Sequence, residues 1–199
     1  MPEKTLVVIA EIANAHQGNV KEAISLYNSS KKSGAHAVKF QIYNPQELLV
    51  TSHTRFEHFE KQSFSEKDWD YIFSEINRDS VEVYADVFGL NSLKIANLNK
   101  LDGIKIHSSD LGNMHLLEEI KRYTGKIFIS AGGGTLPELV EFINPLLDAG
   151  NSKELILMHG FQTYPTPVAE ANLDKITLFQ QLFGDNIKYG YMDHIDASS

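Results

Sequence analysis

The chain contains no cysteine among its 199 residues. This absence excludes disulfide bonds and thiolate metal ligands, and it agrees with the cytoplasmic location that we expect. No apolar run approaches the roughly 18 residues needed to span a bilayer, and the N-terminus lacks the basic and apolar regions of a signal peptide. The sequence therefore predicts a protein that is not associated with a membrane.

Basic residues are also in short supply, with 18 Lys and Arg against 26 Asp and Glu and a formal net charge of -8. Nucleic acids and anionic membranes need a field of positive charge, so neither is expected as a partner. An anionic small molecule would need a few lysines placed locally. With 42% hydrophobic residues the chain can bury a large core, and we expect one domain over residues 1–199.

Seven apolar runs that end in chemically capable side chains are the most informative feature of the sequence. Helix-like stretches lie between them. This rhythm predicts an α/β fold of the TIM (β/α)8 barrel type, with functional groups at the carboxyl ends of the strands. The runs cover residues 6–10, 35–43, 81–87, 103–106, 127–129, 155–158 and 187–192.

Two lysines interrupt these apolar runs at positions that favour the barrel interior. Side chains alternate along a strand, so Lys39 and Gln41 share the face opposite Val38. Lys105 occupies the equivalent face of its run. A lysine there is either paired with a carboxylate such as Glu11 or binds a ligand, and two of them predict a compact positive site for phosphate or carboxylate.

The connecting segments carry further signals. Residues 44–65 form a long connection that predicts either an active-site lid or a surface excursion. Helices are expected over residues 20–32 and 66–76, the second beginning at a Ser65 cap. The glycine-rich residues 130–134 precede a capping box and predict a turn whose backbone amides cradle an anion.

Two loops near the C-terminus hold the remaining candidates. Two prolines within three residues predict a rigid loop that fixes Gln162 and Tyr164. Asp193 and His194 close the last run, where a histidine is either a metal ligand or a structural residue. One histidine is too few for a metal site.

Seven short motifs of the chain together resemble those of the sialic acid synthase family. They occur in the same order and cover nearly the whole chain. They are Glu11-Ile12-Ala13-x-x-His16-Gln17-Gly18, Ala37-Val38-Lys39-Phe40-Gln41, Lys105-Ile106-x-Ser108, Ile129-Ser130-x-Gly132, His159-x-x-x-x-Tyr164-Pro165-Thr166, Asn172-Leu173 and Gly190-Tyr191-x-Asp193-His194.

The resemblance implies a TIM barrel transferase. Such an enzyme condenses phosphoenolpyruvate with an open-chain amino-sugar aldehyde such as N-acetylmannosamine, giving a nonulosonic acid and phosphate, with help from a divalent metal, Mn or Mg. Carried over by motif, the residues that would bind the phosphate and carboxylate of phosphoenolpyruvate are Lys39, Lys105, Ser108 and Ser130.

The resemblance also implies roles for the remaining polar residues. His194 would be one of two histidine ligands of the metal. Asp110 falls where the family has a glutamate near the reacting atoms. The residues that would hold the sugar or manage protons are Glu11, Gln41, Tyr164 and Asp193.

The sequence departs from the family pattern at several positions. Asp86 replaces a threonine, and its carboxylate should repel the phosphate that a threonine would contact. Gln162 replaces an asparagine, and both it and Asp86 are expected to face substrate. Met192 replaces a serine and cannot donate to phosphate, while Gly133 replaces a methionine. These changes indicate a divergent subgroup.

The resemblance further implies an eighth strand, a second metal histidine and a small antifreeze-like domain beyond Ser199, with a homodimer as the full-length assembly. We therefore expect the chain to be a fragment of a longer protein and to turn over poorly alone.

Two other functions remain open from the residues. One is a Schiff-base aldolase with Lys39 or Lys105 as nucleophile, since a desolvated lysine suits that role. The other is a non-catalytic sugar-binding barrel.

Overall fold

A computed structural model describes residues 6–149 and 154–196 of the chain. It divides into two compact units, Met1–Ile104 and Lys105–Ser199, called here the first and second unit. Strand β4 (Gly103–Ile106) contains the boundary between them. Among the described residues, no helix has both the length and the apolar content needed to cross a bilayer.

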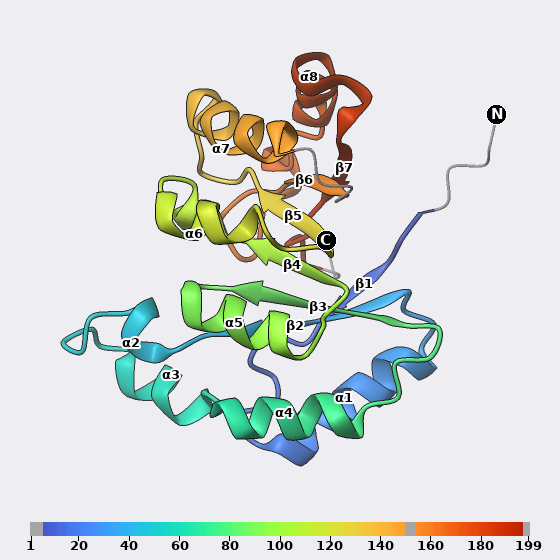
Figure 1. Ribbon diagram of the computed structural model, residues 1–199. Helices are drawn as coiled ribbons and strands as arrows, with labels where there is room; N and C mark the ends of the chain where they lie inside the picture. The colour runs from blue at the N-terminus through green and yellow to red at the C-terminus, as the bar shows by residue number, and fades with distance from the viewer. Residues whose placement is uncertain (1–5, 150–153, 197–199) are drawn as a thin grey trace. The chain divides into compact units, whose positions relative to one another are not determined.

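The first unit begins with three parallel strands in chain order, which Figure 1 shows with their helices. Residue pairing matches Glu11 with Lys39 and Gln41 with Asp86 across neighbouring strands. The elements are β1 (Ile9–Glu11), α1 (Val20–Lys32), β2 (Ala37–Ile42), α2 (Pro45–Leu48), α3 (Phe56–Gln62), α4 (Glu66–Glu75), β3 (Glu82–Val87) and α5 (Leu90–Leu98).

The alternation of β2 sorts its side chains into two environments, as the sequence predicts. Phe40 is fully buried among the rings of Tyr27, Trp69 and Phe73, with centroids 5.5 to 6.4 Å away. Those rings come from helices α1 and α4, so Phe40 faces the helical layer. Period-two alternation then directs Lys39 to the opposite face of the strand.

Helix α1 has the bounds that the sequence predicts, and α4 ends one residue earlier than expected. The predicted cap at Ser65 is confirmed: its hydroxyl accepts from the Asp68 amide at 3.2 Å, and the Asp68 carboxylate accepts from the Ser65 amide at 2.9 Å. This reciprocal pair satisfies backbone donors that have no partner inside the helix.

Replacing Ser65 by alanine should lower the free energy of unfolding by about 1 kcal/mol, because the first turn of α4 loses its cap. Urea denaturation measures the change. The matched control is Ser74→Ala in the same helix, where an exposed serine gives way to a better helix former and the expected change is within about 0.5 kcal/mol. Equal effects of the two substitutions would contradict the role of the cap.

Residues 44–65 are not the structureless connection that the sequence suggests. They contain α2 and α3, and Tyr43 anchors them by donating its hydroxyl to Asn14 at 3.2 Å and to the Phe59 carbonyl at 3.3 Å. The Tyr43 and Phe59 rings also meet edge to face. The sequence analysis did not predict these helices, because helices of four and seven residues leave too little periodicity to detect. A lid and a surface excursion both stay predictions for this segment.

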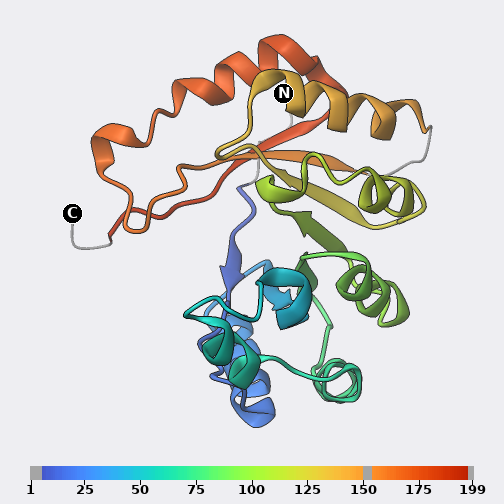
Figure 2. The ribbon, with the colours of Figure 1, turned by 90° about the vertical axis from the view of Figure 1, so that its left-hand side faces the viewer.

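The second unit repeats the same arrangement. Its strands β5, β6 and β7 are parallel and in chain order, and Ser130, Met158 and Gly190 pair across them in one row. Figure 2 shows helices α7 and α8 along one face of these strands. The elements after β4 are α6 (Met114–Ile120), β5 (Lys126–Ser130), α7 (Leu136–Asp148), β6 (Leu155–His159), α8 (Asp174–Phe183) and β7 (Lys188–Tyr191).

The first apolar run forms a shorter strand than predicted. Leu6, Val7 and Val8 lie outside β1, and each exposes about half of its surface or more. Pairing with β2 begins only at Ile9, opposite Ala37. The apolar pattern correctly predicted a strand here. It could not show at which residue the pairing with β2 begins.

Candidate functional site

The first unit holds a buried ion cluster on β1, β2 and β3, formed by Glu11, Lys39 and Asp86. The Lys39 ammonium lies 2.7 Å from Asp86 Oδ2 and also contacts the Glu11 carboxylate. Lys39 and Asp86 are 8% and 3% exposed, whereas the Glu11 side chain keeps 39% of its surface. Gln41 is paired in register with Asp86 and is partly exposed. The pairing of Lys39 with Glu11, one of the two alternatives from sequence, is confirmed.

The two carboxylates keep Lys39 in its charged form. Burial disfavours the ammonium form, but attraction to Asp86 and then Glu11 outweighs burial and raises the pKa of Lys39 above its ordinary value. The sequence could not show that Asp86 reaches this ammonium. Anion binding at Lys39 stays a prediction. A protonated amine is also a poor nucleophile, which argues against Lys39 as a Schiff-base lysine.

The loop after β1 is built around His16, which is only 1% exposed. Its Nδ1 accepts from the Gly18 amide at 3.1 Å, and its ring stacks on Phe64 with centroids 4.5 Å apart. Burial lowers the pKa of His16, so the ring is neutral near pH 7. Gly18 has a φ of 76°, and a Cβ there would clash with the Lys61 carbonyl. The His16 motif thus fixes a loop rather than supplying a reacting group.

The second unit gathers polar groups where its strands end, called here the Ser130 cluster: Ser108, Ser130, Gly132 and Gln162. The Gln162 amide donates to the Gly132 carbonyl at 3.1 Å and to Ser108 Oγ at 3.5 Å. Ser130 is 1% exposed, and its hydroxyl has no hydrogen-bond partner within the described ranges. A buried hydroxyl without a hydrogen-bond partner is suited to donate a hydrogen bond to a ligand.

Lys105 lies on β4 between two fully buried isoleucines and is itself 7% exposed. The following turn (Ser108–Asp110) is a 3-10 helix in which the Asp110 carboxylate accepts from Asn113 at 3.1 Å. His107 Nδ1 lies 3.0 Å from the Ser109 hydroxyl. The catalytic role of Asp110 stays a prediction, since these contacts only fix its turn.

The last predicted residues lie around the end of β7. His194 Nδ1 is 3.1 Å from the Phe161 carbonyl, and because a carbonyl only accepts, Nδ1 carries the proton. Nε2 then presents its lone pair, which is the arrangement of a metal-binding histidine. Asp193 is exposed and accepts from the Ile195 amide at 2.9 Å. Tyr164 is 84% exposed. Its ring packs edge-on against the ring of His194, with the two ring centroids 5.8 Å apart.

His194 fits one position of a metal site but does not complete one. Within residues 6–149 and 154–196, no three His, Asp or Glu side chains are grouped to hold a metal ion. A divalent metal needs several such ligands. The role of His194 as a metal ligand stays a prediction.

Two methionines that the sequence analysis did not group lie on one face of the sheet: Met158 in β6, and Met192 directly after the end of β7. A Cβ at Gly190 would meet Met158 Sδ at 2.5 Å, and a Cβ at Gly160 would meet Met192 Cε at 2.9 Å. The neighbouring His159 takes the other face, where Nε2 lies 2.8 Å from the Ala171 carbonyl. His159 is thus structural, and alternation from it would have assigned the methionines to the strand face of the Ser130 cluster.

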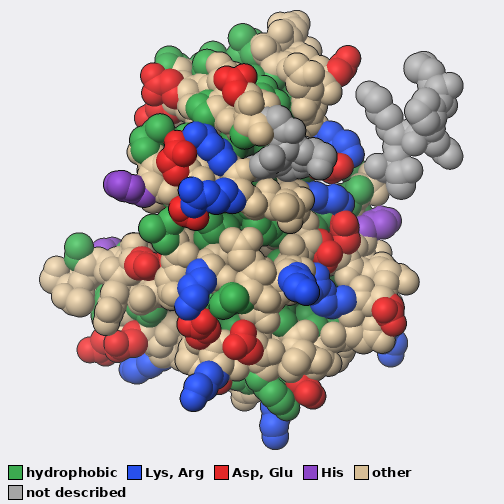
Figure 3. All heavy atoms as spheres, viewed as in Figure 1, with side chains coloured by type: hydrophobic (Ala, Val, Ile, Leu, Met, Phe, Trp, Pro, Cys, Tyr) green, Lys and Arg blue, Asp and Glu red, His purple; other side chains and the backbone are tan. Residues whose placement is uncertain are grey.

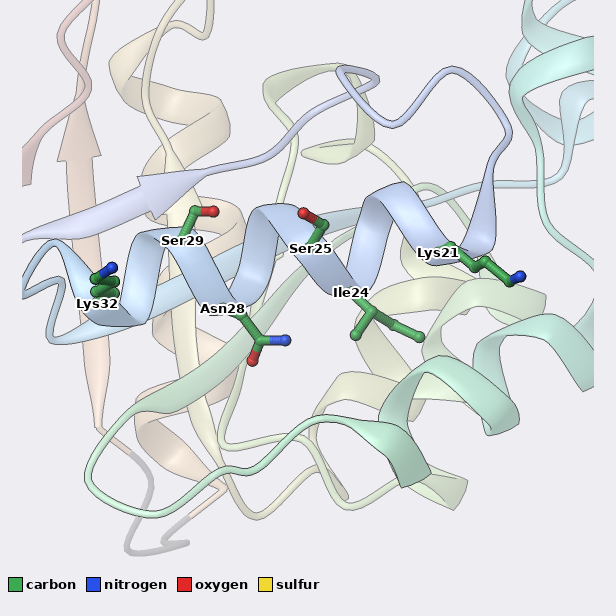
Figure 4. A pocket seen from close by; sticks show the side chains of 6 residues that line it. All are labelled: Lys21, Ile24, Ser25, Asn28, Ser29 and Lys32. Carbon is green, nitrogen blue, oxygen red and sulfur yellow. The ribbon is translucent and has the colours of Figure 1, made fainter.

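The first unit has two further surface features. Over helices α4 and α5, Figure 3 shows acidic and basic side chains interspersed, and one such pair joins Lys94 to Glu66 at 3.1 Å. Figure 4 shows an open depression whose lining comes from the single helix α1, including Lys21 and Lys32. The first surface mixes charges of both signs, and the second is lined by one helix alone.

Parallel strands joined by helices, with polar side chains where the strands end, define a protein of the (β/α) barrel class. The crystal structure of N-acetylneuraminic acid (sialic acid) synthetase from Leptospira borgpetersenii, in complex with citrate, matches with a TM-score of 0.88 at 22% identity. The match covers 96% of this chain and 66% of that one. The predicted fold class, α/β of the TIM barrel type, is confirmed.

The model of the NeuB family matches residues 26–199, and the chain belongs to that family. It is 27% identical to N-acetylneuraminate-9-phosphate synthase of Drosophila melanogaster, over 96% of this chain and 54% of that protein. It is also 27% identical to N,N'-diacetyllegionaminic acid synthase of Campylobacter jejuni, over 96% of this chain and 61% of that protein. The chain thus spans little more than half the length of these relatives.

Proposed function

We propose that this protein condenses phosphoenolpyruvate with an open-chain amino-sugar aldehyde, forming a nonulosonic acid and releasing phosphate. The observation that carries the proposal is the family match over residues 26–199. Relatives named as synthases of neuraminate phosphate and legionaminic acid support the substrate class. The polar groups at the strand ends, taken in each unit by itself, are the candidate residues for this chemistry.

The Ser130 cluster and Lys105 suit the anionic substrate. Lys105 supplies a buried cation, and Ser108 and Ser130 supply hydroxyl donors. Because Ser108 Oγ accepts from Gln162, its own hydrogen is available to a ligand oxygen. Phosphoenolpyruvate carries a phosphate and a carboxylate, and both need donors of this kind.

The aldehyde substrate would bind near the carboxylates of Glu11 and Asp193. Glu11 and Gln41 are exposed enough to bind sugar hydroxyls, and Asp193 and Tyr164 present polar groups near His194. Asp110 is the proposed acid or base near the reacting atoms. A new bond joins C3 of the enolpyruvate to the aldehyde carbon, a water oxygen adds at C2, and phosphate leaves.

A divalent metal, Mn or Mg, is part of this proposal, with His194 as one ligand through Nε2. Such an ion polarises an aldehyde oxygen toward attack. The fit rests on the proton at Nδ1, which fixes the tautomer that a metal requires.

The test is phosphate release from phosphoenolpyruvate by the full-length gene product, with N-acetylmannosamine and related aldehydes, with and without chelator. Lys105→Met should reduce turnover at least 100-fold, because the anion loses its buried cation. The control Lys94→Met removes an exposed lysine and should leave turnover within twofold.

Two outcomes would replace the proposal. A covalent adduct trapped by borohydride with pyruvate would favour the Schiff-base aldolase. Ligand binding without phosphate release, across the whole panel of aldehydes, would favour the non-catalytic sugar-binding barrel.

A further inference from the structure

We propose that His16 is a positioning residue: it locks the loop over residues 12–19 in one conformation, and this loop aims the Glu11 carboxylate at Lys39. The inference deepens the proposed function, on which it rests for the role of Glu11 as a substrate-binding group. It gives a role in the site to a histidine that is buried in the fold.

The loop holds the Glu11 side chain through a backbone amide. Glu11 Oε1 accepts from the Ala13 amide at 3.1 Å, while Oε2 contacts the Lys39 ammonium. The Glu11 side chain keeps 39% of its surface exposed, so burial alone does not fix its carboxylate. The direction of the Ala13 amide therefore helps to set where the carboxylate points.

The Ala13 amide has this direction because the loop is strained. Ala13 and Gln17 have φ values of 46° and 49°, in the left-handed region that residues with a Cβ rarely adopt. Such conformations persist when the surrounding structure holds them. Three overlapping backbone turns within residues 12–19 supply part of that support. Tertiary contacts have to supply the rest.

His16 makes these tertiary contacts. Its ring is 1% exposed and stacks on Phe64, with centroids 4.5 Å apart, and its Nδ1 accepts from the Gly18 amide at 3.1 Å. Gly18 lies so close to α3 that a Cβ would clash with the Lys61 carbonyl. One side chain thus joins the strained loop to the chain around the end of α3.

This lock depends on the neutral form of the ring. An imidazolium carries a hydrogen on both nitrogens, so Nδ1 could no longer accept from Gly18. Burial disfavours the charged form and lowers the pKa of His16. As the pH falls below about 6.5, an opened loop takes up a proton that the closed loop resists, so acid favours the opened loop.

Charged groups around His16 do not account for this pKa, which burial lowers. Residues 12–19 contain no Asp, Glu, Lys or Arg. The Asp68 carboxylate accepts from the Ser65 amide. Tyr43 donates to Asn14 in the loop, and burial raises its pKa to about 12, so it stays neutral. The charged residues that flank the contacts of His16 are exposed: Lys21, Glu22, Glu60, Lys61, Glu66 and Lys67.

The experiment measures amide hydrogen exchange at Ala13 by NMR in the full-length gene product, with two variants that separate the ring from its acceptor. His16→Phe keeps an aromatic ring against Phe64 but cannot accept from Gly18, so the Ala13 amide should exchange about tenfold faster. His16→Asn keeps an oxygen that can accept from the amide two residues on, so exchange should stay within about threefold of the parent.

The matched control is His53→Phe. His53 Nδ1 accepts from the Arg55 amide at 3.1 Å, the same local contact in an exposed turn. Exchange at Ala13 should therefore stay within about twofold of the parent in this variant, since the lost hydrogen bond lies outside the loop.

The pH dependence gives a readout that a merely structural role would not move. In the parent, the protection factor of the Ala13 amide should fall about fivefold between about pH 7 and pH 5.5. In His16→Asn it should stay constant over that range, because position 16 then has no group to protonate. The KM for the aldehyde should rise in His16→Phe and return toward the parent value in His16→Asn.

Two results would overturn the inference. One is exchange at Ala13 in His16→Phe that equals that of the parent, with native thermal unfolding. The other is the same acid sensitivity in His16→Asn as in the parent, and this comparison decides the matter if His16→Phe does not fold. Hydrogen exchange does not depend on turnover, so failure of the proposed reaction would leave these results interpretable.

Discussion

Replacing Lys39 by methionine is expected to lower the free energy of unfolding by about 3–5 kcal/mol, the usual effect of removing one partner from a buried ion pair. The substitution withdraws the ammonium from beside Asp86, which is 3% exposed and lies 2.7 Å away. Methionine fills much of the same volume, so the loss comes mainly from charge. Urea denaturation at pH 7 measures it.

Two further variants serve as controls for this result. Lys94→Met removes a lysine from an exposed pair and should change stability by less than about 1 kcal/mol. Lys39→Met combined with Asp86→Leu removes both charges and should recover at least half of the loss. If the single variant is as stable as the parent, the ion pair contributes nothing to the fold and the electrostatic description of the first unit is wrong.

Replacing Gly132 by alanine is expected to destabilise the second unit by about 1–3 kcal/mol, the range for inserting a methyl group into a packed site. A Cβ at this position would lie 2.5 Å from the Gly160 carbonyl oxygen and 2.5 Å from Gln162 Nε2. The amide can turn away, but the carbonyl belongs to the backbone. Urea denaturation records the loss, and calorimetry should record weaker phosphoenolpyruvate binding, since Gln162 is displaced from Ser108.

Gly112→Ala is the matched control, because a Cβ there would meet nothing within 4 Å. Its effect should stay within about 0.5 kcal/mol. Combining Gly132→Ala with Gln162→Ala should relieve only part of the destabilisation. Full recovery in the double variant would show that the Gly160 carbonyl had room to move.

Much of the fold could be predicted because its signals are local. The strand over residues 103–106 and the helix over residues 20–32 have the predicted bounds. The caps at Ser65 and Thr135 are four-residue patterns, and both form as expected. Residues 44–65 gave no such signal, since short helices are stabilised by contacts such as that of Tyr43 with Phe59, which are distant in sequence.

Only part of the candidate site could be predicted from the sequence, because some of its contacts join residues that are distant in the chain. The face of Lys39 follows from alternation within one strand. Its second carboxylate does not, since Asp86 is 47 positions away and was expected to repel a ligand rather than to neutralise a lysine. The proton on His194 Nδ1 likewise depends on Phe161, a contact 33 positions distant.

The sequence by itself determined which segments become strands and helices, which strand faces carry polar groups, and to which family the chain belongs. Only the tertiary structure decided the pairing of Lys39 with Asp86, the orientation of Gln162 over Gly132 and the tautomer of His194. The physical reason is range: periodicity and capping act between neighbours in the chain, whereas ion pairs and hydrogen bonds between strands depend on distances that exist only after the strands have paired.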